Sequence, residues 1–266
     1  MSRTRTTAAL ILIGLLLVAC GRPTTVRRPA EGTPVRVARV VDGDTVELSD
    51  GRVVRYIGLN TPERGQPFYQ EATEANRRLV AGKEGWLVLD LQTTDPFGRT
   101  LAYLWVGEQF VNLELLRQGY ANAYTAPPNV RYSDLFLAAE AEARKAGIGL
   151  WEPANIPLKI VKIYYDAPGA DADNPNGEWI EIINDGAETV DLTGFTLKDE
   201  GNHLYTFPAV RLAAGQVLEL HSGQGKDLGH TLFWGLVGDA VWDNDGDAAY
   251  LRDSHGRLID SYRYSR

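Results

Sequence analysis

The sequence contains a single cysteine, Cys20, among its 266 residues. No disulfide can form within the chain, so its fold must be held by a hydrophobic core. Positive charge is also scarce: the chain has 27 Lys and Arg residues but 35 Asp and Glu residues, which gives a formal net charge of −8. This argues against a protein that holds nucleic acid by a broad basic surface, since Lys and Arg supply most non-specific affinity for phosphate. The 44% hydrophobic content is that of a globular protein.

The N-terminal residues have the pattern of a secretory signal. Arg3 and Arg5 precede an apolar run over 8–19, which is shorter than the roughly 20 residues of a membrane-spanning helix. Residues 17–20, Leu-Val-Ala-Cys, resemble the lipobox of bacterial lipoproteins, whose cysteine becomes the lipidated first residue. We therefore expect an extracytoplasmic lipoprotein, at the cell surface or in the periplasm, anchored to a membrane through Cys20. The alternatives are an ordinary signal peptide with an incidental cysteine, or an uncleaved anchor.

Short β-branched runs separated by Asp-Gly turns follow residue 34, a pattern typical of a β-meander. Expected strands cover 35–41, 45–48, 53–59, 86–91 and 100–106, and expected helices cover 68–81, 111–118 and 133–145. Five strands with helices inserted late predict a mainly β domain, a five-stranded barrel of the OB type with three helices.

The last third of the chain has an all-β pattern after two prolines at 153 and 157. Expected strands cover 159–165, 179–183, 195–197, 217–220, 248–251 and 258–262. Their even spacing predicts a β-sandwich of about 100 residues. The expected organisation is a signal peptide over 1–19, a flexible tether over 20–34, a first domain over 35–152, a linker over 153–157 and a second domain over 158–266.

The first chemical feature is the Asp-Gly-Asp-Thr turn over 42–45. Asp42 and Asp44, one residue apart across Gly43, offer carboxylate oxygens to a hard cation such as Ca²⁺. A bare hairpin turn is the alternative, because Asp-Gly turns are common in β-proteins.

The second feature combines two arginines with an acid. Arg55 lies in an expected strand that ends at Asn60-Thr61-Pro62-Glu63, where Pro62 interrupts the strand ladder. Arg99 follows an Asp-Pro-Phe-Gly turn over 95–98. Two Arg, one Glu and a hard-metal site suit phosphodiester hydrolysis, because cations stabilise the charge of the transition state while a carboxylate activates water. Each arginine taken alone would be read as a solvated or salt-bridged surface residue.

These motifs occur in an order that resembles the staphylococcal nuclease (thermonuclease) family. The resemblance extends over 35–152 and includes the stretch 111–121 and the closing segment Ala139 to Trp151. It implies an OB-fold barrel with three helices and Ca²⁺-dependent cleavage of DNA and RNA that leaves 3′-phosphate ends.

The resemblance also implies a role for each matching residue. Asp44 and the backbone carbonyl of Thr61 would bind calcium directly, and Asp42 would support these ligands without touching the ion. Glu63 would orient or deprotonate the attacking water. Arg55 and Arg99 would bind the phosphate and stabilise its developing charge. Tyr124 would contact the substrate.

Asn60 departs from the family pattern, which has an Asp as second carboxylate ligand. An Asn carbonyl can still bind Ca²⁺, but a negative charge is lost, and ligand charge tunes calcium affinity. We therefore expect Asn60 to be a metal ligand in a weak site. The alternative is that Asn60 only caps the turn.

The second domain resembles the lamin-tail domain, an immunoglobulin-like sandwich, through residues 177–184 and 190–197 and shorter later matches. The resemblance implies a fold and no activity. The acidic run over 243–247 lacks the Glu that a calcium-binding EF-hand loop requires, so it predicts a polar, solvated β-turn.

The main hypothesis is an enzyme, a thermonuclease-like endonuclease whose partners are DNA, RNA and, through Cys20, a membrane. The alternatives are a catalytically weakened nucleic-acid-binding surface lipoprotein and a surface adhesion protein that acts through its second domain. The ligand of that domain is left open by the sequence, and a monomer is expected.

Overall fold

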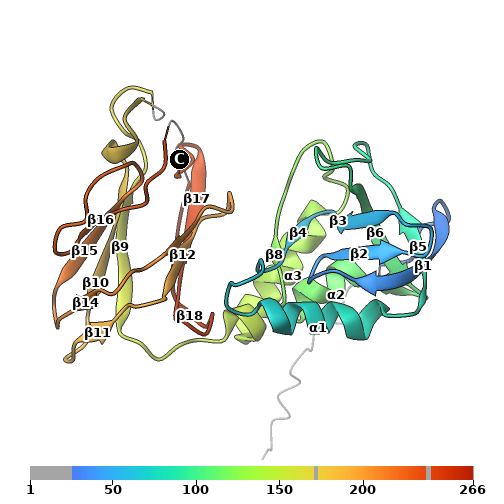
Figure 1. Ribbon diagram of the computed structural model, residues 1–266, viewed down its shortest axis with the longest axis horizontal. Coiled ribbons are helices and arrows are strands. Elements are labelled where there is room, and N and C mark those ends of the chain that lie inside the picture. Colours follow the sequence, from blue (N-terminus) through green and yellow to red (C-terminus); the bar gives the residue numbers. More distant parts are fainter. Residues whose placement is uncertain (1–25, 171–172, 238–240, 266) are drawn as a thin grey trace, which may run out of the picture.

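The computed structural model describes residues 26–170, 173–237 and 241–265. Two domains lie side by side, joined near α3 and the C-terminal strands (Figure 1). Cys20 and the expected signal peptide lie outside the described residues. Within the described ranges, no helix is both long and apolar enough to cross a membrane.

The first domain is a five-stranded closed barrel. Its sheet has the order β3-β2-β1-β5-β6, and a parallel pairing of β3 with β6, with Val54 opposite Thr100, closes it. The strands are β1 (Thr33–Val40), β2 (Thr45–Leu48), β3 (Val53–Tyr56), β5 (Glu84–Val88) and β6 (Thr100–Val106), with short β4 (Leu59–Asn60), β7 (Gln109–Phe110) and β8 (Asn122–Ala123).

Three α-helices among the described residues pack against this barrel: α1 (Tyr69–Val80), α2 (Val111–Arg117) and α3 (Ser133–Ala146) (Figure 1). The buried residues of α1 recur at helical spacing, so one stripe of the helix faces the core. α3 ends at Gly147, whose left-handed φ of 62° is readily adopted by glycine. A 3₁₀ turn, η1 (Gly149–Trp151), follows. The predicted barrel with three helices is confirmed.

The second domain consists of two four-stranded sheets around one core. One sheet has the order β16-β15-β10-β9 and the other β13-β12-β17-β18, while β11 and β14 form a separate pair. The elements are β9 (Leu158–Tyr164), η3 (Pro175–Gly177), β10 (Trp179–Asn184), β11 (Val190–Asp191), β12 (Thr196–Lys198), β13 (Leu204–Thr206), β14 (Arg211–Leu212), β15 (Val217–His221), β16 (Thr231–Phe233), β17 (Gly246–Arg252) and β18 (Leu258–Ser265). The prediction of a mainly β protein is confirmed.

The domains share a small buried cluster at their junction. Trp151, at the end of the first domain, packs edge-on against Tyr250 of β17, with ring centroids 5.6 Å apart. Two guanidinium groups lie over the Trp151 ring, that of Arg144 at 4.5 Å and that of Arg252 at 5.1 Å from its centroid. Arg252 is 7% exposed and donates hydrogen bonds to the carbonyls of Leu150 and Gly256. These contacts orient the second domain relative to the barrel.

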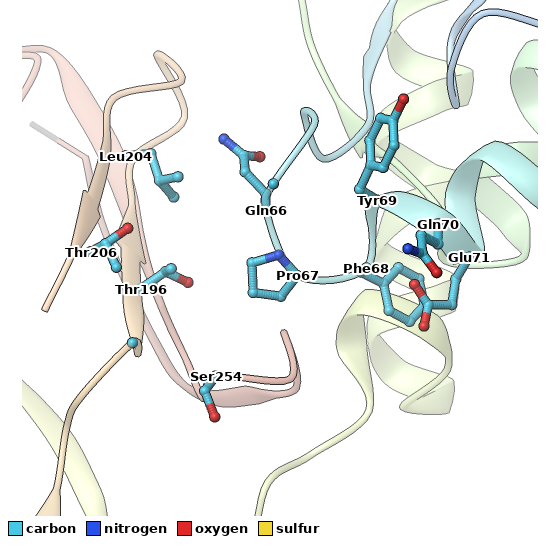
Figure 2. A pocket seen from close by; sticks show the side chains of 12 residues that line it. Gln66, Pro67, Phe68, Tyr69, Gln70, Glu71, Thr196, Leu204, Thr206 and Ser254 are labelled. Carbon is cyan, nitrogen blue, oxygen red and sulfur yellow. The ribbon is translucent and has the colours of Figure 1, made fainter.

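A neutral cavity of about 600 Å³ opens beside this junction, between the start of α1 and strands β12 and β13. Figure 2 shows Gln66 and Pro67 on one side and Thr196 and Leu204 on the other. Because Glu71 is the only acidic or basic residue that lines it, this cavity offers little for phosphate chemistry.

Candidate active site

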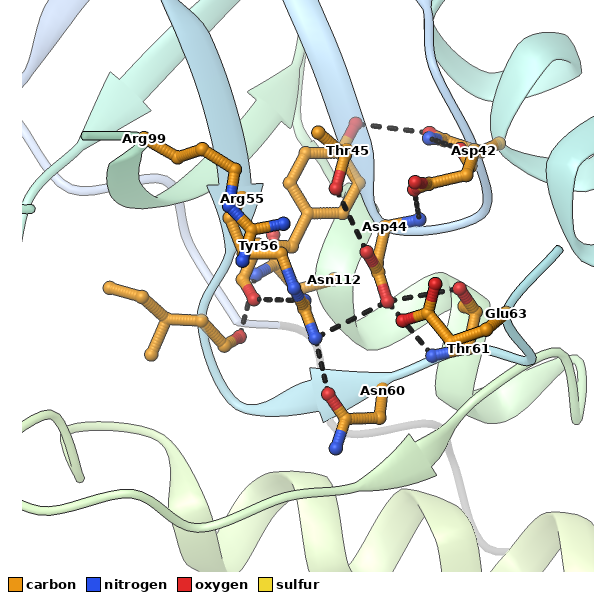
Figure 3. Close-up of polar contacts among 12 residues, drawn as sticks. Asp42, Asp44, Thr45, Arg55, Tyr56, Asn60, Thr61, Glu63, Arg99 and Asn112 are labelled. Atoms are coloured by element: carbon orange, nitrogen blue, oxygen red, sulfur yellow. Dashed lines mark hydrogen bonds and ion pairs between the residues drawn. The ribbon is translucent and has the colours of Figure 1, made fainter. Parts of the chain in front are cut away.

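The Asp-Gly-Asp turn connects β1 to β2 and buries Asp44, which is 3% exposed. One carboxylate oxygen, Oδ1, accepts a hydrogen bond from the Thr45 hydroxyl at 3.0 Å. The other, Oδ2, accepts from the backbone N–H and the hydroxyl of Thr61, each at 2.9 Å (Figure 3). Asp44 therefore connects the turn between β1 and β2 to Thr61, the residue that follows β4. These two segments are distant in the sequence and meet at this carboxylate.

Gly43 allows this close approach. A β-carbon on Gly43 would lie 2.6 Å from Oγ1 of Thr61 and 2.7 Å from its Cβ. Its neighbour Asp42 accepts a hydrogen bond from the N–H of Asp44 at 3.1 Å. Burial, and after it the charge of Asp44, raise the pKa of Asp42 to about 6. The turn thus holds two partly desolvated carboxylates close together, an arrangement that favours a cation.

Arg55 of β3 bridges the buried carboxylate and Asn60. Its Nη2 lies 3.3 Å from Oδ2 of Asp44, and the same atom donates a hydrogen bond to Oδ1 of Asn60. Nη1 donates to the carbonyl of Tyr56 at 2.8 Å. The Arg55 side chain is 13% exposed, so its guanidinium is held in place while one edge stays accessible. The amide oxygen that was expected to bind calcium here accepts a hydrogen bond from Arg55; ligation by Asn60 stays a prediction.

A cavity of about 400 Å³ brings together most of the other predicted residues. Arg55, Asn60, Glu63, Arg99 and Tyr124 all line it. The backbone segments that carry them come from β3, from β4 and the loop after it, from the residue before β6 and from the chain after β8. Asp42, Asp44 and Thr61 are not among the residues that line this cavity, and Arg55 connects the two groups.

Glu63 and Arg99 differ in how firmly they are held. Glu63 is exposed, and only its backbone N–H is anchored, by a 2.8 Å hydrogen bond to the Gln66 side chain. Arg99 donates from Nε to Oδ2 of Asp95 at 2.6 Å, and its guanidinium lies 5.6 Å from the ring centroid of the exposed Phe97. The Asp95 turn therefore fixes the base of Arg99 and leaves its outer nitrogens available to an anion.

Two buried asparagines that the sequence analysis did not single out support this site. Asn76 of α1 donates to the carbonyl of Asp42 at 2.9 Å and accepts from the hydroxyl of Tyr56 at 3.0 Å. Asn112 of α2 donates to the carbonyl of Ile57 at 2.9 Å and accepts from the N–H of Leu104. Both are fully buried. Asn76 therefore connects α1 to the turn that carries the aspartates, and Asn112 connects α2 to the residue that follows β3 (Asn112 in Figure 3).

The donor atoms fit a hard cation that prefers oxygen. Asp44 supplies a carboxylate, and the neighbouring Thr61 and Asn60 supply a backbone carbonyl and an amide oxygen, while the Asp42 carboxylate lies close by. Among the residues that the structure describes, no group of three or more His, Cys, Asp or Glu side chains is arranged to hold a metal. A metal here would therefore depend on the Asp44 carboxylate and on neutral oxygens.

Comparison with known proteins gives matches to both domains. A family model described as "Staphylococcal nuclease homologue" matches residues 53–153, which include Arg55, Glu63 and Arg99. The chain is 36% identical over 130 residues to the thermonuclease of Staphylococcus intermedius, which covers 46% of this chain and 77% of that protein. It is 35% identical over 125 residues to the thermonuclease of Staphylococcus hyicus, with 44% and 74% covered.

The chain belongs to the staphylococcal nuclease family. Endonuclease YncB of Bacillus subtilis (strain 168) is a further relative, 34% identical over 128 residues, or 44% of this chain and 61% of that protein. A second family model, "Lamin Tail Domain", matches residues 152–266. The prediction of a thermonuclease-like phosphodiester hydrolase followed by a lamin-tail domain is therefore confirmed at the level of the families.

Proposed function

We propose that this member of the staphylococcal nuclease family is a calcium-dependent endonuclease that hydrolyses DNA and RNA to leave 3′-phosphate ends. We also propose that it works outside the cytoplasmic membrane, anchored through a lipid on Cys20. The anchor is supported by the lipobox-like residues 17–20 alone. One observation carries the activity: Glu63, Arg55 and Arg99 line a single cavity next to the buried Asp44.

The two arginines in this account bind the scissile phosphate. Arg55 is preorganised by Tyr56, Asn60 and Asp44, and Arg99 by Asp95, so neither has to be ordered when substrate arrives. Fixed cations that face the growing charge of the transition state lower the barrier more than flexible ones, because they need no reorganisation. A calcium ion held by Asp44, Thr61 and Asn60, with Asp42 supporting these ligands, would neutralise further charge on the phosphate.

Glu63 is the residue placed to handle the proton. Its exposed carboxylate lines the cavity without a hydrogen bond from another described side chain. It can therefore accept a proton from a water that attacks phosphorus, as the new P–O bond forms and the bond to the 5′-oxygen breaks; the departing 5′-oxygen takes a proton from solvent water. The products are a 3′-phosphate on one fragment and a 5′-hydroxyl on the other.

Two features favour the alternative of a nucleic-acid-binding protein with weak turnover. The net charge of −8 limits long-range attraction of substrate, and Asn60 supplies no charge to the metal site. A pure binding protein, however, has no use for the free carboxylate of Glu63. An adhesion role for the lamin-tail domain is the third possibility, and it is compatible with nuclease activity.

The activity is tested by incubating the protein with single-stranded DNA, duplex DNA and RNA across a calcium series from micromolar to tens of millimolar, with EGTA as the control. The proposal predicts calcium-dependent internal cleavage, with 3′-phosphates found by mass spectrometry of the products. Calorimetric titration of calcium, without substrate, measures the metal site independently. Retention of DNA without cleavage at every calcium concentration would favour the binding protein.

A further inference from the structure

The lamin-tail domain reaches the edge of the active-site cavity. Asn202, in the turn between β12 and β13, lines the same cavity as Glu63, Arg55 and Arg99. Asn202 is exposed and adopts a left-handed backbone with φ 78°. The cavity therefore has one wall that belongs to the second domain.

Lys198, at the end of β12, lies close behind that wall. It lines a narrow space together with Asn60, Asn122 and Asn202. A second space lined by Lys198 is also lined by Pro62 and Gln66. Lys198 is thus adjacent, from the other domain, to the loop that carries Asn60 and Glu63.

The positive charge of Lys198 is not paired with an acidic side chain. It is half-buried and makes no hydrogen bond or ion pair with any residue of the described ranges. The acidic residues around it have other partners: Glu140 with Arg144 at 3.6 Å, Asp199 with His203 at 2.6 Å, and Glu200 with Arg263. No neighbouring acid therefore neutralises the lysine by direct pairing.

The charge state of Lys198 is compatible with attraction of an anion. Burial, and after it the charge of Arg252, lower the pKa of Lys198 to about 8, so the group is mainly cationic at neutral pH. Asp199, and after it Glu63 and Asp44, act in the opposite direction.

We infer that the lamin-tail domain completes the nucleic-acid cleft: its β12–β13 turn forms one wall, and Lys198 attracts the phosphate backbone of the bound strand. This inference rests on the proposed nuclease function. It gives the second domain a role in substrate binding by this chain, although that domain is acidic elsewhere. In a protein with net charge −8, an unpaired lysine next to the cleft adds to the positive potential of Arg55 and Arg99, which line it.

Contacts at the junction between the domains fix the position of Lys198 relative to the active site. β12 pairs with β17, Lys198 lying opposite Tyr250. Tyr250 in turn packs against Trp151 and accepts a hydrogen bond from Arg144 at 2.9 Å. Lys198 is therefore connected to the first domain through one cross-strand pair, then through a buried ring contact with η1 and a hydrogen bond with α3. Its distance from the active site does not depend on a flexible linker.

The test compares Lys198→Met with the full-length wild type. Methionine keeps most of the side-chain volume and removes a half-buried charge, so the variant should fold at least as stably. We expect KM for a 20-nucleotide single-stranded DNA to rise about 5-fold at low salt with kcat unchanged. The slope of log Kd against log salt, measured by anisotropy of labelled DNA in EGTA, should decrease in magnitude by about 0.7, the value for one lost phosphate contact.

Two further variants make the result specific. Lys198→Arg should restore KM, because the charge is restored. Lys226→Met removes an exposed lysine from the chain between β15 and β16, and these two strands lie on the side of the sandwich away from the barrel (Figure 1). This variant should leave KM and the salt slope unchanged. An unchanged KM and salt slope in Lys198→Met, or an equal effect of Lys226→Met, would overturn the inference. Because the anisotropy measurement needs no cleavage, a failure of the nuclease proposal would be seen separately, as an inactive wild type.

Discussion

The guanidinium of Arg55 lies 3.3 Å from the carboxylate of Asp44, and both side chains are largely buried, with 13% and 4% exposure. The proposed phosphate-binding residue and the proposed metal ligand thus form one ion pair. A buried pair of this kind resists removal of either partner, because the remaining charge is left uncompensated in a medium that solvates it poorly.

Removal of Arg55 should therefore cost stability as well as activity. We expect Arg55→Ala to lower the free energy of unfolding by about 3–5 kcal/mol, the range for breaking a buried pair. Arg99→Ala, whose pair with Asp95 is 34% exposed on the arginine side, should cost about 1 kcal/mol or less. Chemical denaturation in EGTA measures both. Added calcium should recover part of the loss in Arg55→Ala, and equal losses in the two variants would contradict this view of the pair.

The charge at position 60 should set the calcium affinity. Asn60→Asp adds a carboxylate beside Asp44, and we expect it to tighten calcium binding about 10-fold, or about 1.4 kcal/mol. Asn60→Ala, which removes the hydrogen-bond acceptor of Arg55 and adds no charge, should not tighten binding. Calorimetry on the two variants and the wild type checks this without an activity assay. If Asn60→Asp binds calcium no more tightly than wild type, Asn60 does not face the ion.

Much of the barrel could be predicted from the sequence. The strand over 100–106 has the predicted ends, and α1 differs from its prediction by one residue at each end. Both have a long hydrophobic pattern with clear stop signals. The strands β4 and β8 were not predicted as a pair, because two residues carry no periodicity; their register nevertheless places Asn60 opposite Asn122.

The supporting polar residues were harder to find. Asn76 lies between Ala72 and Leu79 on the apolar stripe of α1, and this position on the buried face was the available signal. No such signal existed for Lys198 and Asn202, because they belong to a different domain and approach Glu63 through the packing of the two domains, including that of Trp151 against Tyr250.

The acidic run over 243–247 corrects one expectation. Asp245 is exposed in the expected turn, but Asp247 is only 4% exposed and accepts hydrogen bonds from the N–H groups of Glu200 and Ala248. The alternation of β17 turns this carboxylate inward, which composition alone could not reveal.

Asp247 should make the stability of the lamin-tail domain depend on pH. Burial raises the pKa of Asp247 from 3.8 to about 6. Since the folded state then binds the proton more tightly than the unfolded state, stability is lost as pH rises from about 4 to about 6. We expect Asp247→Asn to be more stable than wild type by about 2 kcal/mol at pH 7.5, with this advantage absent below pH 4. Thermal unfolding at the two pH values measures it. The exposed neighbour is the control: Asp245→Asn should show no such pH dependence, and a similar gain in both variants would point to surface charge.

The most direct test of the account replaces Glu63 by Gln and measures cleavage and DNA binding together at saturating calcium. Gln keeps the size and polarity of the side chain but cannot accept the proton from water. We predict that Glu63→Gln cleaves DNA at least about 10²-fold more slowly than wild type, while its calcium affinity and its Kd for DNA stay within about 2-fold of wild type. Cleavage by Glu63→Gln at the wild-type rate would contradict the assignment of this cavity as a nuclease active site.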